Sequence, residues 1–297
     1  MSERTQEPNF LLVVTDQQRT DTLGAYGCEL GATPHIDAMA AAGVTFPRGY
    51  CNNPLCMPSR AALLTGRYPS STGVRTNGCT AHPGQPLLAE LLAQAGYRTG
   101  AFGKVHFHPG GGEPGGYWPE NRTFIESGAD LTQPYLGFQT VAVGCGHGEV
   151  LPGLHAAELA EHHPDVYAKR GRDNALVVPD PWLFGAQKIE TYQTAIPPEH
   201  YATTWVTDKT IDFIQSAEEP FFAWCGIPDP HHPFKPPGDY WHKFDPADMP
   251  PATCREGELD DKPPHFRSFW EGEYAGLDTD GFLLGSKGQL TDERLRI

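Results

Sequence analysis

The sequence contains no apolar run that approaches the ~20 residues needed for a membrane-spanning helix. Its first ten residues, MSERTQEPNF, are polar and lack the apolar stretch that forms the centre of a signal peptide. We therefore expect a cytoplasmic protein that does not associate with a membrane.

Basic residues are also few. Lys and Arg number 22 against 37 Asp and Glu, so the formal net charge at pH 7 is −15. This charge argues against nucleic acid as a partner. It does not exclude an anionic small molecule, because a few local cationic groups can hold one against an acidic background.

The cysteines do not form a recognisable framework. There are seven, an odd number, and no CxxC pair occurs among them. A set of structural disulfides or a structural zinc site is therefore not expected. The seven positions are Cys28, Cys51, Cys56, Cys79, Cys145, Cys225 and Cys254.

What is present points to an α/β fold. The 297 residues, 39% of them apolar, suffice for one large domain or two modest ones. Continuous apolar runs at residues 10–14 and 221–227 are typical of strands buried on both faces, and shorter strands are expected at 44–46, 97–102 and 138–143. Because 33 Gly and 29 Pro are present, we also expect long connecting loops.

Helix signals lie between these runs. Residues 33–43 and 86–96 each have a proline near the start and a glycine at the end. Residues 197–217 carry apolar side chains near helical spacing, and residues 155–163 suggest a shorter helix. In the first of these helices we expect Ile36, Met39 and Ala40 to face the core.

Residues 54–67, PLCMPSRAALLTGR, carry a candidate nucleophile. Pro58 and Ser59 favour a helix start, and Gly66 favours a left-handed end. Cys56 would then lie just before a helix N-terminus, where N–H groups and the helix dipole stabilise an anion or a thiolate, with Arg60 one turn further. A buried structural cysteine would fit the same local pattern.

Polar side chains follow the first expected strand. Asp16 and Gln17 come directly after residues 10–14, at the end of the strand where α/β sheets bind ligands. Their oxygens are of the kind that hard cations prefer. Taken alone, Asp16 would equally well cap a turn.

Two further expected strands end in the same way. Lys104 and His106 follow residues 97–102, and their alternation around Val105 would let both face one pocket. The stretch Pro228-Asp229-Pro230-His231-His232-Pro233 follows residues 221–227, and its prolines make a stiff loop for an acid catalyst. A surface lysine, a hydrogen-bonded structural histidine and solvated loop histidines are the alternatives for these side chains. Asn77 is either an oxyanion donor or an ordinary turn residue before glycine.

These motifs together resemble one family. Cys56-Met57-Pro58-Ser59-Arg60 followed by Leu64-Thr65-Gly66-Arg67 closely resembles the signature of the formylglycine-dependent sulfatases, in the alkaline phosphatase-like superfamily. Met57 departs from it, since a small residue is usual there. Further matches, with Phe102 and Val105 as departures, are Thr33-Pro34-His35-Ile36-Asp37, Gly96-Tyr97-Arg98-Thr99, Gly103-Lys104-Val105-His106 and the Pro-His-x-Pro motif at His231.

The resemblance implies a mechanism. Cys56 would be oxidised to formylglycine by a maturation enzyme, and a divalent cation, most plausibly Ca²⁺ but also Mn²⁺ or Mg²⁺, would be bound by Asp16, Gln17 and the modified Cys56. Arg60, Lys104, His106 and His231 would be catalytic, with Asn77 contacting the substrate. His231 would protonate the leaving alcohol, His106 would serve as a base, and Arg60 and Lys104 would hold the sulfate charge.

Two other functions remain open. The related phosphonate monoester hydrolases also place an Asn near the position of Asn77, but carry Tyr and Thr where this chain has Lys104 and His106. A non-catalytic fragment is the second alternative, because the later Ser/Thr-Asp-His/Asn-Gly motif of sulfatases is absent. Asp173-Asn174 is the only Asp-Asn pair, and Ala175 follows it.

The expected layout is one incomplete sulfatase-type catalytic domain, truncated at its C-terminus. Its parts would be a core with the nucleophile at 8–106, variable loops at 107–197, the helix, strand and histidine loop at 198–240, and an irregular extension at 241–297. We expect a small-molecule or carbohydrate sulfate ester as substrate.

Overall fold

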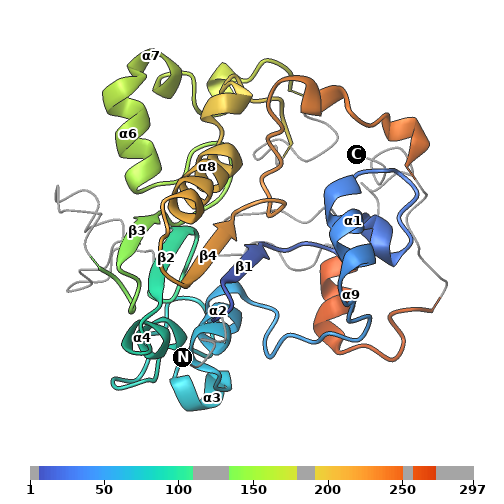
Figure 1. The fold of residues 1–297 in the computed structure, drawn as a ribbon. Helices are drawn as coiled ribbons and strands as arrows, with labels where there is room; N and C mark the ends of the chain where they lie inside the picture. The colour runs from blue at the N-terminus through green and yellow to red at the C-terminus, as the bar shows by residue number, and fades with distance from the viewer. Residues whose placement is uncertain (1–6, 110–133, 179–190, 250–256, 272–297) are drawn as a thin grey trace. The chain divides into compact units, whose positions relative to one another are not determined.

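The computed structural model describes residues 7–109, 134–178, 191–249 and 257–271 (Figure 1). The chain divides into two compact units. The first comprises Met1–Ala168 and Glu199–His232, and the second comprises Lys169–Pro198 and Pro233–Ile297. The sheet and all the predicted site residues belong to the first unit.

A parallel four-stranded sheet forms the centre of the first unit. Its strands are β1 (Phe10–Thr15), β2 (Arg98–Gly103), β3 (Thr140–Val143) and β4 (Phe221–Ile227), in the order β1-β4-β2-β3. Every pairing is parallel, so all four carboxyl ends point to the same edge of the sheet. The predicted α/β fold with a mostly parallel sheet is confirmed.

Helices cover both faces of this sheet (Figure 1). On one face, α2 (Cys56–Thr65) and α4 (Leu88–Gln94) form a core with Phe222 and Trp224 of β4. On the other face, α8 (Ala202–Gln215) packs on Ala223 and Cys225 of the same strand. Successive residues of β4 therefore serve opposite cores, which is why its sequence is a continuous apolar run.

The remaining elements of the first unit are short. The helical signals at residues 33–43 and 155–163 correspond to α1 (Pro34–Ala42) and α6 (Leu154–His162). Gly66 ends α2 in the left-handed region (φ 65°), as predicted. No helix in the described ranges combines the length and the apolar character needed to cross a membrane. The other helical elements among the described residues are α3 (Pro69–Thr72), α7 (Pro164–Tyr167), η1 (Thr20–Thr22), η2 (Gly24–Tyr26) and η5 (Pro198–His200), the last of which begins one residue before this unit.

Three local predictions were wrong. Residues 44–46 form no strand. Ile36 and Met39 do not enter the core but are exposed, at 39% and 68%. β1 is not buried on both faces, because it lies at the edge of the described sheet and leaves Leu11 and Val13 about half exposed (49% and 50%).

The described residues of the second unit contain little regular structure. The helices among them are η3 (Arg172–Asn174), η6 (Gly238–His242), η7 (Pro246–Asp248) and α9 (Pro264–Glu271). Isolated parallel bridges join Thr191 to Phe234 and Thr194 to Pro237. Phe234, Tyr240, Trp241 and Phe244 help to line a cavity of about 690 Å³ within this unit.

Two glycines allow β2 and β4 to approach closely where they end. A Cβ on Gly226 would lie 2.0 Å from the Lys104 carbonyl oxygen, and a Cβ on Gly103 would lie 2.2 Å from the Gly226 oxygen. Both atoms are backbone, so neither clash can be relieved by a side-chain rotation. The close approach also sets the position of Lys104, whose N–H donates to the Gly226 oxygen (2.8 Å).

We expect Gly226→Ala to lower the free energy of unfolding by about 3 kcal/mol, because the added methyl forces these two strands apart. Gly49→Ala is the matched control, since a Cβ there meets only one atom, the Phe46 oxygen, at an ordinary 3.6 Å. Urea denaturation of both variants measures the difference. Equal stabilities would contradict the tight packing described for Gly226.

Candidate active site

The carboxyl ends of all four strands carry polar side chains to one edge of the sheet. Asp16 follows β1, Lys104 follows β2, His147 lies in the loop after β3, and His231 lies in the loop after β4. Ligand sites in open α/β sheets form at this edge. The structure thus brings together three side chains that the sequence predicted for one site, and adds His147.

A buried ionic cluster forms the base of this site. The Lys104 ammonium donates to Oδ2 of Asp16 (2.6 Å), and a guanidinium nitrogen of Arg60 lies 3.7 Å from the same oxygen. Arg60 also donates to the Lys104 carbonyl (2.6 Å), which accepts a second hydrogen bond from the Trp224 indole (3.0 Å). Lys104 is fully buried and Arg60 is 3% exposed.

The charges of this cluster do not balance. Burial alone would raise the pKa of Asp16, but neighbouring His147, Lys104 and Arg60 outweigh that effect and hold the pKa well below its usual range. Asp16 is therefore ionised at neutral pH. One carboxylate against two cations leaves an excess positive charge at the site, which suits an anionic ligand despite the acidic composition.

His147 is the site residue that sequence reasoning missed. The Lys104 ammonium donates to its Nε2, which also lies 3.5 Å from Oδ2 of Asp16. Its ring stacks on that of His231, with 3.4 Å between centroids and 7° between planes. Its loop carries no periodic pattern and no metal spacing, so only its distance after a predicted strand could have indicated it.

His106 lies beside the cluster rather than in a strand. β2 ends at Gly103, so the predicted alternation of Lys104 and His106 around Val105 does not apply, and all three side chains are buried. The backbone of His106 is in the left-handed region (φ 52°). Burial, with Lys104 and Arg60 nearby, lowers the pKa of His106 to about 2, so the ring is neutral.

The two adjacent histidines after β4 have different surroundings. His231 stacks on His147, and its Nδ1 lies 2.5 Å from the His232 carbonyl oxygen. A carbonyl oxygen can only accept a hydrogen bond, so Nδ1 carries a proton. Nε2 is then the nitrogen that can exchange a proton with a substrate. His232 instead places its Nδ1 3.1 Å from Oε1 of Gln17. The arrangement favours His231 over His232 for the predicted acid.

Cys56 is the first residue of α2, one position further into the helix than expected. It is half-buried, and its Sγ lies 3.5 Å from Oδ1 of Asn77. The same oxygen accepts from the Met57 N–H (3.2 Å). Asn77 therefore holds the start of α2, and its amide nitrogen is the group left to donate to a substrate.

A complete site for the predicted cation is not formed by the described residues. Within those ranges, no three His, Cys, Asp or Glu side chains are grouped closely enough to hold a metal ion. Asp16 supplies one carboxylate, whose Oδ2 is already bonded to Lys104, and Gln17 supplies one amide oxygen. Ca²⁺ takes six to eight oxygens in proteins, so this donor set alone does not fit it.

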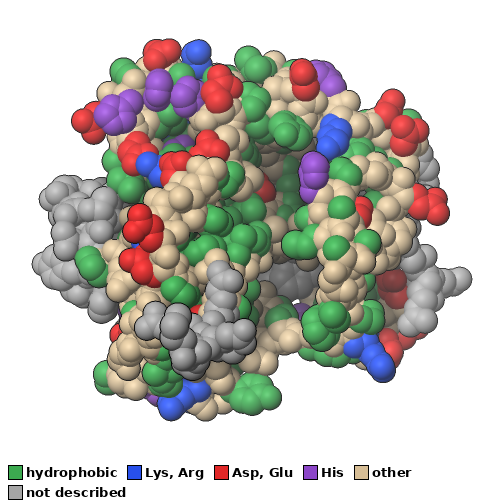
Figure 2. All heavy atoms as spheres, viewed as in Figure 1, with side chains coloured by type: hydrophobic (Ala, Val, Ile, Leu, Met, Phe, Trp, Pro, Cys, Tyr) green, Lys and Arg blue, Asp and Glu red, His purple; other side chains and the backbone are tan. Residues whose placement is uncertain are grey.

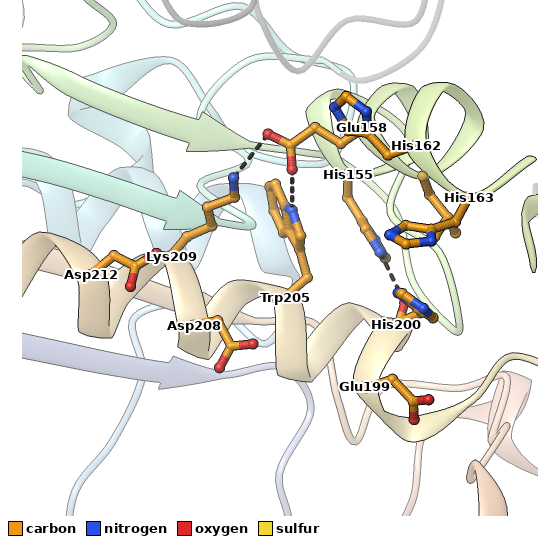
Figure 3. Close-up of a pocket in the computed structure, with 11 residues that line it drawn as sticks. His155, Glu158, His162, His163, Glu199, His200, Trp205, Asp208, Lys209 and Asp212 are labelled. Atoms are coloured by element: carbon orange, nitrogen blue, oxygen red, sulfur yellow. Dashed lines mark hydrogen bonds and ion pairs between the residues drawn. The ribbon is translucent and has the colours of Figure 1, made fainter.

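A second cavity, of about 240 Å³, lies between α6 and α8 (Figure 3). Glu158 accepts there from the Trp205 indole (2.8 Å) and the Lys209 ammonium (2.9 Å). Figure 2 shows histidine and acidic side chains gathered over this part of the surface. None of the predicted catalytic residues lines this cavity.

Buried His155 forms the base of this second cavity. It accepts from the Leu151 N–H at Nδ1 (3.1 Å), so its Nε2–H donates to the His200 carbonyl (3.1 Å). Both ring nitrogens are therefore satisfied by a neutral imidazole. Burial lowers the pKa of His155 to about 4.

Comparison with known proteins identifies the class. The model of the Sulfatase family matches residues 8–253. The chain therefore belongs to the sulfatase family. It is 28% identical over 284 residues to the uncharacterized sulfatase YidJ of Escherichia coli (strain K12), covering 92% of this chain and 48% of that one. It is also 28% identical over 236 residues to the N-acetylglucosamine-6-O-sulfatase of Bacteroides thetaiotaomicron, covering 79% of this chain and 32% of that one.

Among solved structures, the phosphonate monoester hydrolase of Agrobacterium radiobacter is similar, with a TM-score of 0.70 and 27% identity. That comparison covers 98% of this chain and 54% of the other. The chain thus spans about half the length of YidJ and of this hydrolase, and about a third of the N-acetylglucosamine-6-O-sulfatase.

We expect Asp16→Asn to destabilise the protein at neutral pH by about 3–5 kcal/mol, because it leaves buried Lys104 and Arg60 without a counter-charge. The matched control is Asp21→Asn, which removes a solvent-exposed ion pair with Arg19 and should change stability little. Urea denaturation at pH 7 compares the two. Similar small losses would show that Asp16 does not neutralise the cluster.

Stability should fall as the pH drops from about 6.5 to 4. The unfolded chain binds a proton at His155 below its ordinary pKa of 6.5, whereas the folded protein resists protonation until about 4, so acid favours unfolding by about 1.4 kcal/mol per pH unit for this group. In His155→Gln, the free energy of unfolding should therefore fall less steeply with decreasing pH, by about 1.4 kcal/mol per pH unit. Exposed His35→Gln should leave the slope unchanged, and two identical slopes would contradict this account.

Proposed function

We propose that the protein hydrolyses sulfate monoesters through a formylglycine derived from Cys56. The observation that carries this proposal is the position of Cys56 at the first turn of α2, with Arg60 one turn further reaching the buried Asp16–Lys104 pair. A helix N-terminus and an excess cationic charge both favour an anion beside residue 56. Because the chain belongs to the sulfatase family, we propose that this anion is the sulfate group of an ester.

The chain's own groups have distinct tasks in this proposal. Arg60 and Lys104 stabilise negative charge on the sulfate oxygens, and their burial strengthens the interaction. Arg60 is fixed by a backbone carbonyl, so it is oriented before substrate binds. Asn77 holds the first turn of α2 through the Met57 N–H and offers its amide to an ester oxygen.

Proton transfer falls to the histidines. A hydrated formylglycine supplies two hydroxyl groups on one carbon, one to attack sulfur and the other to expel sulfate and restore the aldehyde. For this step His231 must carry a proton on both ring nitrogens. Nδ1–H stays bonded to the His232 carbonyl, Nε2 gives its proton to the leaving alcohol oxygen, and the stack with His147 holds the ring in place. Neutral His106 is the proposed acceptor of the proton released at the second stage. Burial and the nearby Lys104 and Arg60 lower its pKa, and a bound anion offsets the part that is due to these two cations.

Sulfatase-family enzymes generally use a divalent cation as well, but the described residues do not supply enough ligands to hold one. The substrate we propose is a small-molecule or carbohydrate sulfate ester, in keeping with the name of the Bacteroides relative. The proposal also requires a maturation enzyme that modifies Cys56. We propose that this enzyme and the protein itself are cytoplasmic.

Phosphonate monoester hydrolysis is the second candidate, favoured by the likeness to the Agrobacterium hydrolase. Lys104 and His106 weigh against it, since the resemblance assigns Tyr and Thr to those positions in that group. A non-catalytic anion-binding role would leave Cys56 unmodified.

Matched 4-nitrophenyl esters of sulfate and of phenylphosphonate separate these functions. We expect kcat/KM to be higher for the sulfate ester, and Cys56→Ala to abolish turnover by removing the nucleophile. Cys51→Ala, an exposed cysteine five residues earlier, should retain full activity. Undiminished sulfate release by Cys56→Ala would overturn the proposal.

Mass spectrometry of the tryptic peptide Gly-Tyr-Cys-Asn-Asn-Pro-Leu-Cys-Met-Pro-Ser-Arg, residues 49–60, tests the modification separately. The peptide contains both Cys51 and Cys56, so alkylation of Cys51 is an internal control. We expect one alkylated cysteine and one aldehyde. Two alkylated cysteines together with full activity would exclude formylglycine as the nucleophile.

A further inference from the structure

We propose that the first turn of α8 is a platform that positions the stacked pair His147 and His231, with Asp229 as the positioning residue. The platform is defined by Tyr201, Ala202 and Thr203. This inference rests on the proposed function for the role it gives His231, but the platform itself is a set of contacts that can be tested without turnover.

Asp229 connects the platform to the loop that carries His231. Oδ1 of its carboxylate accepts from the Tyr201 hydroxyl (3.3 Å), and Oδ2 accepts from the Thr203 hydroxyl. Its own carbonyl accepts from the Asp16 N–H (3.1 Å), so the same residue also ties this loop to the end of β1. Asp229 lies two residues before His231, at the start of the loop.

The carboxylate is suited to this contact. Tyr201 is the residue that caps the N-terminus of α8, and Thr203 is the second residue of the helix. A negative group at that end interacts favourably with the helix dipole as well as with the two hydroxyls. Burial raises the pKa of Asp229, and the hydroxyl donors oppose that effect.

Ala202 connects the same turn to the loop that carries His147. Its N–H donates to the Glu149 carbonyl (3.1 Å), two residues after His147. The loop is closed below this point by the Cys145 N–H, which donates to the Pro152 carbonyl (3.0 Å), and by the bridge between Gly144 and Gly153. Tyr201 and the first two residues of α8 thus contact both histidine loops.

The arrangement of the rings follows from this common support. The centroids of His147 and His231 are 3.4 Å apart and their planes are nearly parallel. Such a stack requires both loops to keep their places, and a displacement of about 1 Å is enough to misplace a catalytic group. Since His231 is the proposed acid, loosening the platform should impair protonation of the leaving group before other steps.

Thr203→Val is the variant that tests the proposal, because it removes one hydroxyl while keeping the shape of the side chain. Thr207→Val is the matched control in the same helix, where the hydroxyl bonds only to the helix carbonyls of Thr203 and Thr204. Thr203→Ser keeps the donor and should restore wild-type behaviour. All variants are made and compared in the full-length protein.

Esters with different leaving groups give the activity measurement. An alkyl sulfate needs an acid to protonate its leaving alcohol, whereas 4-nitrophenolate leaves readily without one. We expect Thr203→Val to lower kcat about tenfold or more for an alkyl sulfate and less than about threefold for 4-nitrophenyl sulfate, with KM little changed. Equal losses for both esters, or equal effects of Thr203→Val and Thr207→Val, would overturn the positioning role.

Hydrogen exchange gives a measurement independent of activity. In Thr203→Val, we expect faster exchange at the amides of Asp16 and His231, which donate to Asp229 and Pro228 respectively, but no change in Thr207→Val. If wild-type protein cleaves no sulfate ester, the proposed function fails while this measurement still decides the platform. Unchanged exchange in Thr203→Val would refute the platform even in an active enzyme.

Discussion

The buried charge cluster of Asp16, Lys104 and Arg60 is the constraint on which the site depends. Two cations and one carboxylate cannot be taken out of water unless each keeps a partner, and here one oxygen of Asp16 serves Lys104 while a backbone carbonyl holds Arg60. The cluster exists because the ends of β1 and β2 stand on either side of β4, whose Gly226 lets the Lys104 backbone approach. The charge cluster therefore depends on the order of the strands and on the glycine at position 226.

The parts of the structure that could be predicted are those determined by a short, continuous stretch of sequence. β4 matches its predicted bounds because both of its faces are buried, and α2 ends at Gly66 because a left-handed residue is needed there. The predictions for β1, Ile36 and Met39 failed for the opposite reason. Their apolar character is real, but whether an apolar residue is covered depends on which elements lie beside it, and no local pattern records that.

The same distinction applies to the site. Cys56 and Arg60 occupy one helix, so their spacing in the sequence fixes their relation in space. His147 is joined to His231 only through the fold, by a stack across loops that follow different strands. His106 is an intermediate case. Its place after β2 was predicted, but its left-handed backbone was not, and that conformation ends the alternation of side chains expected for residues 104–106.

The pairing of β1 with β4 also has a consequence for the order of events during synthesis. β1 is made first, yet its only hydrogen-bonded neighbour in the described sheet is completed when residues 221–227 have been made. Such long-range pairing closes late, so the core against which α2 buries Met57, Pro58 and Arg60 cannot form until then. The residues of α2 that this core covers are thus expected to stay accessible until β4 has been made. The modification of Cys56 proposed above would be easiest in that interval, before Met57, Pro58 and Arg60 are buried.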